Sequence, residues 1–557
     1  MLEINHTANY SCAHLNRQLI SILSSLKVPD SVFLDILDDM VHDVDKMLTD
    51  PLQASRILRE TADGLGIQHA MAKIVEAGFL QRRDPYIKNL LEAFRVARLK
   101  EARKKARIPV IKGVFLMGVL DETNTLQENQ IFCKFIDGDY NEQTLTGECL
   151  VYRSPSLHPG DVRMLKAVDI PQLRDLCNVV VFPAQGERDI PSMCSGGDLD
   201  GDCYSVIWDK RLFPPPDYRN IIPMSYTAPK PLTLADEVTI DHIKEFFVSF
   251  IKLSNLGQIA NAHLAKADRS PDGVFDFGCI QLAEYHSMAV DFAKTGVPAE
   301  PNPSLLTMPN QRYPDFMEKK DKPSYESEKA LGKLFRRIGH IKYREYRDTL
   351  WDVNTDGVYY DARIQVPGME SYIGEARRLK RYYDRELRDM MGRFGVNSEA
   401  EIMSGWIIKW MHKRRNERLF EVQQQARKDM MRMKTRWYHT EFSASKNIAM
   451  KQEDLEAKAA AWYYVAYHPH EQRRQREEGK QFDKRYNTHD EELLSFPWVA
   501  QSILCELARK RMGISNTNSA YPTFAEDVIA MYDPGEPPSD QEDDDYSESD
   551  YGSEYEP

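Results

Sequence analysis

The sequence predicts an α+β fold in which a small closed β-barrel lies between two helical regions. Three observations predict it: apolar residues at helical spacing before residue 108, six short β-rich runs within about 100 residues after it, and helical patterns again from about residue 230. Six short strands separated by turn residues favour a barrel over alternating strand–helix units. With 557 residues, 42% hydrophobic and 29% charged, the chain can bury a substantial core.

Residues 1–108 are predicted to be helical. The first helix carries an apolar stripe at helical spacing, formed by Leu15, Leu19, Ile22 and Leu23. A second amphipathic segment follows a capping signal at residues 30–31. A third helix opens at residues 84–85, where an aspartate precedes a proline, and it ends in the basic run 95–107.

The barrel is predicted over residues 109–215. Val, Ile, Phe and Cys occur there in short runs separated by Gly, Pro, Asn and Asp, which is the pattern of strands joined by tight turns. A proline-rich stretch at residues 213–216 ends the region. The six expected strands are residues 110–111, 114–120, 131–136, 148–152, 179–182 and 203–208.

The rest of the chain is predicted to be helical up to about residue 532. Residues 377–415 mix Arg and Lys with Tyr, Trp and Met, which suits either an RNA-facing channel or a solvated helical face. The final segment, 533–557, holds 11 Asp or Glu and no Lys or Arg, and is predicted to be disordered. Without it the formal net charge of −13 falls to about −2, so local basic faces matter more than the total.

Composition argues against several classes of protein. No run of 18 uncharged apolar residues is present, and the first residues lack the basic and apolar pattern of a secretory signal. The eight cysteines are scattered without a CxxC pair, which argues against a zinc site or a disulfide framework. We therefore expect reduced thiols, no membrane partner and a cytoplasmic or nuclear protein.

The strongest chemical signal is the sequence SGGDLDGD at residues 195–202. Asp198, Asp200 and Asp202 alternate along the chain, and the three glycines between residues 196 and 201 permit a tight turn that brings the carboxylates together. Clustered carboxylates raise one another's pKa unless a cation neutralises them, and hard oxygen ligands suit Mg²⁺ or Mn²⁺. An open site of this kind is typical of phosphoryl transfer.

Two other interpretations of this segment stay open from the residues alone. Closely spaced aspartates in a surface turn are often only solvated. A calcium-binding EF-hand loop needs Gly at its sixth position and Glu at its twelfth, but counting from Asp198 these positions hold Cys203 and Asp209. The glycine lies fourth instead, and residues 203–208 have the pattern of a strand.

The acidic segment resembles the DbDGD signature, with b a bulky residue, of the eukaryotic cellular RNA-dependent RNA polymerases of RNA silencing, in their fungal-like form. It is similar also to the three-aspartate loop of multisubunit DNA-dependent RNA polymerases. The likeness to the first family extends from about residue 10 to residue 510. Its other motifs occur in the same order, as GVLDETNTL at 118–126, YRSPSLHPGDVR at 152–163, AVDFAKTG at 289–296, AWYYV at 461–465 and FPW at 496–498.

The resemblance implies a particular fold class, a double-psi β-barrel that carries the aspartates and is embedded between helical regions. The family has a second such barrel upstream, facing the metal site, and that barrel is expected to be missing from this sequence. The domains implied are a helical connector at 1–108, the barrel at 109–215, a neck region at 216–370, a helical head region at 371–532 and the acidic tail at 533–557.

The resemblance also implies an activity, RNA-directed RNA polymerisation that makes double-stranded RNA for gene silencing. Asp198, Asp200 and Asp202 would be the catalytic residues and would bind Mg²⁺, with Mn²⁺ as a possible substitute. The partners implied are a single-stranded RNA template, ribonucleoside triphosphates and proteins of RNA silencing.

Three basic residues are candidates for substrate binding. Lys294 lies in the AVDFAKTG motif, where it could contact a phosphate or serve as a structural ion-pair partner. Arg153 and Arg163 flank the HPGD turn and could face RNA or simply bracket the barrel.

The main alternative function is a catalytically silent RNA-binding or scaffold remnant of such a polymerase. The intact aspartate triplet favours catalysis, whereas the expected loss of the first barrel favours the remnant. A large subunit of a DNA-dependent RNA polymerase is a third possibility. It is disfavoured because the segment reads DLDGD rather than the NADFDGD typical of that family.

Overall fold

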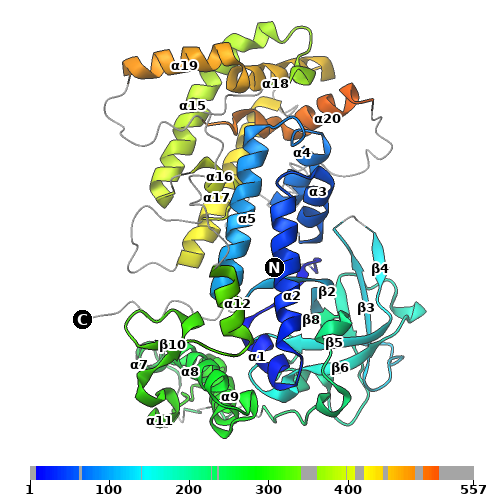
Figure 1. The fold of residues 1–557 in the computed structure, drawn as a ribbon, viewed down its shortest axis with the longest axis vertical. Helices are drawn as coiled ribbons and strands as arrows, with labels where there is room; N and C mark the ends of the chain where they lie inside the picture. Colours follow the sequence, from blue (N-terminus) through cyan, green and yellow to red (C-terminus); the bar gives the residue numbers. More distant parts are fainter. Residues whose placement is uncertain are drawn as a thin grey trace. The chain divides into compact units, whose positions relative to one another are not determined.

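The computed structural model describes residues 8–513 except 62–65, 139–140, 227–228, 232, 235–236, 340–359, 397, 408–418, 443–449 and 483–492. Two compact units are present (Figure 1). Unit 1 contains Met1–Met40 and Lys100–Ile341, and unit 2 contains Val41–Leu99 and Lys342–Pro538.

Unit 1 is built around a closed six-stranded β-barrel. Hydrogen-bonded neighbours follow the order β2, β7, β3, β6, β5 and β8, and β8 pairs back to β2. The pairs β2–β7 and β3–β6 are parallel, and the other four are antiparallel. Strands β1 and β4 extend the sheet beside β2 and β3. The strands are β1 (Cys12–Leu15), β2 (Ile108–Leu120), β3 (Gln130–Ile136), β4 (Glu142–Thr144), β5 (Gly147–Arg153), β6 (Arg163–Ala167), β7 (Val179–Phe182) and β8 (Cys203–Ile207).

This closed barrel between helical segments confirms the predicted fold class, an α+β protein with a double-psi β-barrel. Four strands differ from expectation. The predicted strands at 110–111 and 114–120 are one continuous strand, β2, because Gly113 lies within the sheet rather than ending it. A Cβ at Gly113 would lie 2.9 Å from the Cβ of Ala13, so glycine allows β1 to approach closely. Strands β1, β4 and β6 were not expected, and β1 lies in the region 1–108 that was predicted to be helical.

The barrel interior is filled by apolar side chains from every strand of the ring. Tyr204 and Phe182 are fully buried there, with ring centroids 4.7 Å apart in an edge-on arrangement. Burial of this apolar surface is the main source of stability for the barrel. The core includes Val114, Leu116, Ile131, Cys133, Phe135, Cys149, Val151, Leu165, Val180, Phe182, Ile190, Cys194, Tyr204 and Val206.

Most helices of unit 1 lie before or after the barrel in sequence. Helix α1 (Arg17–Ser25) begins after Asn16, whose side chain accepts from the Leu19 N–H, and it buries Leu19, Ile22 and Leu23 of the predicted apolar stripe, whereas Leu15 is buried in β1. Helix α7 has no buried residue, although it is rich in Ile and Phe. The helices after the barrel are α7 (Ile240–Leu253), α8 (Leu256–Arg269), α9 (Phe277–Val290), α10 (Phe292–Thr295), α11 (Pro303–Leu306) and α12 (Ala330–Gly339).

Helices α2 (Asp30–Lys46) and α5 (Pro85–Lys105) each contribute residues to both units. The other described helices of unit 2 are α3 (Pro51–Glu60), α4 (Ile67–Glu76), α15 (Glu370–Phe394), α16 (Glu399–Ser404), α17 (Leu419–Phe442), α18 (Gln452–Tyr467), α19 (Pro469–Phe482) and α20 (Gln501–Arg511).

Unit 2 has an aromatic core made largely from the AWYYV and FPW motifs. Trp462 stacks on Phe496 with ring centroids 4.0 Å apart, and Tyr463 stacks on Tyr467 at 4.3 Å. Trp498 stacks on Tyr86 of α5 at 5.5 Å. Large stacked rings contribute strongly to stability, so these motifs serve packing in unit 2.

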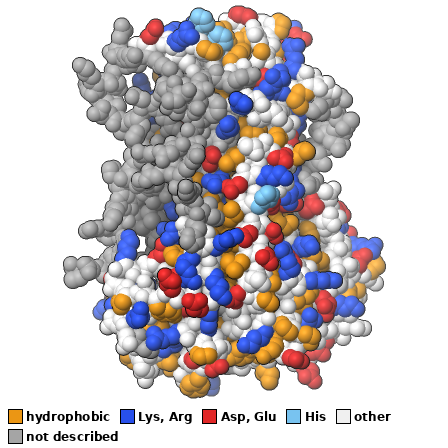
Figure 2. All heavy atoms as spheres, viewed as in Figure 1, with side chains coloured by type: hydrophobic (Ala, Val, Ile, Leu, Met, Phe, Trp, Pro, Cys, Tyr) orange, Lys and Arg blue, Asp and Glu red, His pale blue; other side chains and the backbone are white. Residues whose placement is uncertain are grey.

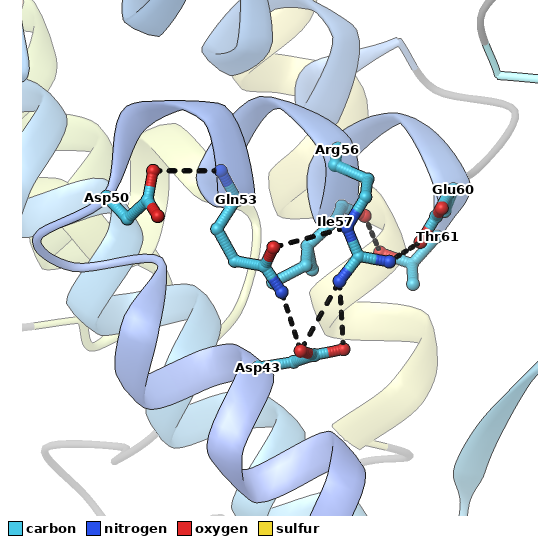
Figure 3. Close-up of polar contacts among 7 residues, drawn as sticks. All are labelled: Asp43, Asp50, Gln53, Arg56, Ile57, Glu60 and Thr61. Atoms are coloured by element: carbon cyan, nitrogen blue, oxygen red, sulfur yellow. Dashed lines mark hydrogen bonds and ion pairs between the residues drawn. The ribbon is translucent and has the colours of Figure 1, made fainter.

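A polar network fixes the turn between α2 and α3 (Figure 3). Asp50 is the N-cap of α3, and its carboxylate accepts from the Gln53 N–H at 3.3 Å. The Gln53 amide donates to Asp43 of α2 at 2.6 Å, and Arg56 donates to both oxygens of Asp43 at 3.3 Å. One carboxylate therefore joins the two helices through two donors.

Several sequence predictions fall outside these findings. The domain boundaries at 108, 215 and 370 stay predictions, and the acidic tail at 533–557 lies outside the described residues.

Among the helices that the structure describes, none has the length and apolar character that crossing a bilayer requires. On the face shown in Figure 2, basic and acidic side chains of the described residues are interspersed.

The fold predicts a pH-dependent stability for unit 2 that originates at Asp84. This buried N-cap of α5 accepts from the Tyr86 and Ile87 N–H groups and from the Tyr463 hydroxyl. Burial raises the pKa of Asp84 to about 7, and the hydrogen bonds oppose that shift only in part. The native state therefore binds a proton that the unfolded state releases near pH 4, and the free energy of unfolding falls as pH rises toward 7.

We predict that Asp84→Asn keeps the cap but removes this dependence. Between pH 5 and pH 8 the free energy of unfolding of the unmodified chain should fall by about 3 kcal/mol, and that of the variant should not show this fall. Urea unfolding followed by tryptophan fluorescence measures the difference, since Trp498 packs in the same core. Asp50→Asn, at a more exposed cap, is the control. Parallel pH profiles for unmodified chain and Asp84→Asn would contradict the prediction.

Candidate metal centre

The three aspartates lie on a loop between helix α6 (Ile190–Met193) and strand β8. We call residues 194–202 the acidic loop. Carboxylate oxygens of Asp198, Asp200 and Asp202 all lie within 4.8 Å of one another. The predicted convergence is therefore present, and the side chains do not diverge into solvent.

The backbone of the acidic loop makes this convergence possible. Leu199 and Gly201 have positive φ angles of 62° and 130°, which turn the chain sharply between successive aspartates. The Asp198 N–H donates to Asp202 Oδ2 at 3.0 Å, which closes the loop on itself. The Gly118 N–H of β2 donates to the Asp202 carbonyl at 2.9 Å, so the loop is also fixed to the barrel.

Two glycines leave room for the Tyr204 ring beneath the loop. A Cβ at Gly118 would lie 2.5 Å from Tyr204 Cε2 and 2.8 Å from Leu199 Cδ2. A Cβ at Gly197 would lie 2.2 Å from the Tyr204 hydroxyl oxygen. The loop therefore rests directly on a fully buried aromatic side chain, and neither glycine can gain a side chain without a shift of the loop.

Two basic residues predicted from the sequence lie at this site. Arg153 Nε is 2.7 Å from Asp202 Oδ1, and both side chains are mostly buried. Lys294 Nζ is 3.6 Å from Asp200 Oδ2, and both of these side chains are largely exposed. Arg153 thus partly neutralises the inner carboxylate, while Lys294 lies at the open side of the cluster.

Arg163, the third basic candidate, has different neighbours. Its side chain is buried, and Nη1 donates to the Ile221 carbonyl at 2.8 Å. Burial lowers the pKa of Arg163. A substrate-binding role for Arg163 stays a prediction. His158, in the same motif, caps the following turn by accepting from the Gly160 N–H at 3.0 Å.

Sequence reasoning missed Asp291, which interacts electrostatically with the cluster. Burial raises the pKa of Asp291, the charges of Lys294 and Arg153 lower it, and the charge of Asp198 raises it. Asp291 precedes Lys294 by three residues in AVDFAKTG, and the Lys294 N–H donates to the Asp291 carbonyl at 3.0 Å. The one-turn spacing of an acid and a base in a matched motif was the available signal.

The donor set fits a hard divalent cation. Three carboxylates offer oxygen ligands, and two of them, Asp198 and Asp200, are exposed and can reach a shared ion. Mg²⁺ and Mn²⁺ prefer such ligands and keep positions open for water or phosphate oxygens. Among the described residues, these are the ones that could hold a divalent metal.

Comparison with known proteins decides the family. A family model described as RNA dependent RNA polymerase matches residues 1–338, and one described as RdRP, head domain, matches residues 359–522. The chain belongs to the RNA-dependent RNA polymerase family. The acidic loop and all three candidate basic residues lie inside the first match.

Individual polymerases of this family are similar over most of the chain. A probable RNA-dependent RNA polymerase 1 of Oryza sativa subsp. japonica is 40% identical over 514 residues, which cover 90% of this chain and 66% of that protein. RNA-dependent RNA polymerase 1 of Schizosaccharomyces pombe is 36% identical over 547 residues, which cover 92% and 44%. The chain thus spans between about two fifths and two thirds of the length of these relatives.

A solved structure is also similar. The RNA dependent RNA polymerase QDE-1 from Thielavia terrestris matches with a TM-score of 0.43 and 18% sequence identity, covering 94% of this chain and 60% of that chain.

The basic stretch at 377–415 lies partly outside the described residues, which end at 407 in this part of the family's head domain. Within α15, Arg377 pairs with Glu471 at 2.5 Å and Lys380 with Asp384 at 2.5 Å. Arg381 and Arg385 are exposed on the same helix. An RNA-facing role for the stretch therefore stays a prediction.

We predict that Gly197→Ala abolishes the metal centre of this polymerase-family chain. The new methyl group would clash with Tyr204, Arg153 Cδ and the Pro191 carbonyl, so the acidic loop must move. Overpacking of this kind costs about 1–3 kcal/mol in stability. The melting temperature should fall, and MnCl₂ should no longer raise it. Gly339→Ala, with open space around the added methyl, is the control. A Mn²⁺ response like that of the unmodified chain would contradict the prediction.

We also predict opposite effects of Arg153→Gln in the absence and presence of metal. Without the guanidinium, repulsion among the carboxylates increases, so the melting temperature without metal should fall. The rise on adding MnCl₂ should become larger, because the cation then relieves more repulsion. Arg211→Gln is the control, since Arg211 pairs with the mostly buried Asp209 in the same unit. If MnCl₂ raised the melting temperature of Arg153→Gln by less than that of the unmodified chain, the prediction would be wrong.

Proposed function

We propose that this chain carries the catalytic centre of an RNA-directed RNA polymerase that makes double-stranded RNA for gene silencing. The observation that carries the proposal is the convergence of three carboxylates within 4.8 Å on a barrel loop of a family member. The substrates are a single-stranded RNA template and ribonucleoside triphosphates, and the setting is the cytoplasm or nucleus. Proteins of RNA silencing are the proposed further partners.

The reaction is nucleotidyl transfer. The 3′-oxygen of the growing strand forms a bond to the α-phosphorus of the incoming triphosphate, and the bond from that phosphorus to the bridging oxygen breaks. Pyrophosphate leaves, and the proton of the 3′-hydroxyl passes to solvent. Mg²⁺, or Mn²⁺, would activate the attacking oxygen and offset the charge that develops on the phosphate.

The chain's own residues would prepare this reaction. Asp198 and Asp200 present exposed carboxylates toward the substrate side of the cluster, and Asp202 supplies the inner one. Arg153 forms the 2.7 Å ion pair with Asp202, which lowers the repulsion among the three carboxylates while no cation is bound. We therefore propose that Arg153 stabilises the cluster before the metal binds, in addition to any contact with substrate.

Lys294 is the basic residue best placed to meet a triphosphate. Its ammonium group lies 3.6 Å from Asp200 and its side chain is largely exposed, so it can turn toward phosphate oxygens when nucleotide binds. Asp291, one helical turn away, limits how far this positive charge acts on the cluster. We propose that Lys294 binds the β- and γ-phosphates.

The activity assay uses purified chain, an RNA template, the four ribonucleoside triphosphates and MgCl₂. We predict that Asp200→Asn lowers incorporation by about a thousandfold or more, because losing one ligand raises the barrier by several kcal/mol and each 1.36 kcal/mol is tenfold. Asp217→Asn is the control, since Asp217 is an exposed aspartate of the same unit.

Two outcomes would count against the proposal. Equal incorporation by Asp200→Asn and unmodified chain, both well above a reaction without protein, would remove the acidic loop from the mechanism. Incorporation by unmodified chain no higher than in a reaction without protein, with Mn²⁺ still bound, would favour the RNA-binding or scaffold alternative for this chain on its own.

A further inference from the structure

Asp161 is a fully buried carboxylate of the HPGD turn, and it accepts three hydrogen bonds. The N–H groups of Leu157 and His158 donate to Oδ2 at 3.0 and 2.9 Å. The Tyr226 hydroxyl donates to Oδ1, and the Ser195 backbone lies close enough to lower the pKa of Asp161. Burial raises the pKa of Asp161 to about 6, and these donors act against the shift. The group is therefore ionised, and acts only as an acceptor, at neutral pH.

The groups that contact Asp161 come from three separate segments of unit 1. Leu157 and His158 belong to the turn between β5 and β6, the Ser195 backbone lies at the start of the acidic loop, and Tyr226 follows the barrel. Tyr226 also covers the loop directly. A Cβ at Gly196 would lie 3.0 Å from Tyr226 Cβ, and Gly196 has a positive φ of 73°.

The segment that carries Tyr226 is itself fixed. We call residues 219–226 the strap. The Asn220 amide donates to the Met164 carbonyl at 3.2 Å, and Arg163 donates to the Ile221 carbonyl at 2.8 Å. Arg188 donates to the Met224 carbonyl at 2.8 Å. The strap therefore has contacts to the barrel that do not involve Asp161, so removing the Tyr226 hydroxyl alone should leave the strap in place.

A continuous set of polar contacts connects Asp161 with a predicted metal ligand. The Ser195 backbone acts on the charge of Asp161, and the Ser195 carbonyl accepts from Arg153 Nη1 at 3.3 Å. The Ser195 hydroxyl donates to the Pro155 carbonyl at 2.5 Å. Arg153 then pairs with Asp202 at 2.7 Å. The position of Ser195 thus helps to decide where the arginine holds the inner carboxylate.

We propose that Asp161 and Tyr226 are positioning residues, which hold the start of the acidic loop so that its three aspartates converge on one point. The proposal rests on the proposed function for its consequence, metal binding, but not for the loop geometry itself. Neither residue touches the reacting atoms. Their effect passes through Ser195 and Gly196 to the loop.

The first experiment measures how often the acidic loop opens when no metal is present. Amide hydrogen exchange, read by mass spectrometry on peptides covering residues 194–204, reports local opening of the acidic loop. We expect Tyr226→Phe and Asp161→Asn each to speed exchange there by about tenfold or more, the effect of losing a hydrogen bond to a buried charged group. Exchange in peptides from β3 and β7 should not change, which separates loop opening from loss of the whole barrel.

Matched control variants exist in the same unit. The Tyr325 hydroxyl donates to Asp268 Oδ2 at 2.8 Å, and Asp268 is a buried aspartate outside the barrel. Tyr325→Phe and Asp268→Asn therefore make the same chemical changes at another buried carboxylate. They should leave exchange of the 194–204 peptides unchanged.

The second experiment measures Mn²⁺ binding by the loss of the free-ion electron paramagnetic resonance signal. We expect the dissociation constant for Mn²⁺ to rise about tenfold in Tyr226→Phe, to rise at least as much in Asp161→Asn, and to stay unchanged in Tyr325→Phe. Asp200→Ala gives the level of Mn²⁺ binding that remains when the aspartate cluster is disrupted. A purely structural role would lower the melting temperature but leave this constant unchanged.

The outcomes separate the two proposals. Unchanged exchange at residues 194–204 in Tyr226→Phe, which is the milder variant, would overturn the positioning role. Faster exchange there together with equal Mn²⁺ binding by unmodified chain and Asp200→Ala would support positioning and overturn the metal function. Faster exchange with an unchanged Mn²⁺ constant in both variants would overturn the link from Asp161 to the aspartates.

Discussion

Mutual repulsion of three carboxylates within 4.8 Å is the constraint on which the design of unit 1 depends. At such a separation each pair of charges costs from about 1 kcal/mol in water to about 4 kcal/mol near a protein surface. A loop left to itself would relieve that repulsion by spreading. This loop is held by its own Asp198 N–H, by the Arg153 guanidinium and by strand β2 beside it. Contacts with the barrel thus keep the carboxylates together, which a bound cation would otherwise have to do alone.

Much of this arrangement was predictable from the sequence, because it depends on local chemistry. Alternating aspartates among glycines can only converge through a tight turn, and the turn is found at Leu199 and Gly201. Short runs of Val, Ile and Phe between turn residues correctly indicated a closed barrel. The likeness of the acidic segment and of AVDFAKTG to polymerase motifs indicated the family, and Lys294 does lie beside Asp200.

The remaining features depend on contacts between residues far apart in the chain, which a pattern search cannot supply. Arg153 was predicted either to face RNA or to bracket the barrel, and its partner Asp202 is 49 residues away in sequence. Asp161 looked like part of a turn, and only the fold brings Ser195 and Tyr226 to it. Gly113 was interpreted as a break in a strand, although it is there because β1 packs against it. In each case the residue type was informative but its partner was not visible.

The pairing of β8 has a consequence for the order in which the chain acquires its chemistry. Strand β8 follows the acidic loop directly, and its partners β2 and β5 lie much earlier in the chain. Synthesis proceeds from the N-terminus, and a ribosome-bound chain that ends before β8 has no closing strand for its barrel. Until β8 pairs with β2 and β5, the aspartates lie on an unpaired end of the chain and their charges can move apart. The barrel therefore cannot hold the three aspartates together until residue 207, the end of β8, has been synthesised.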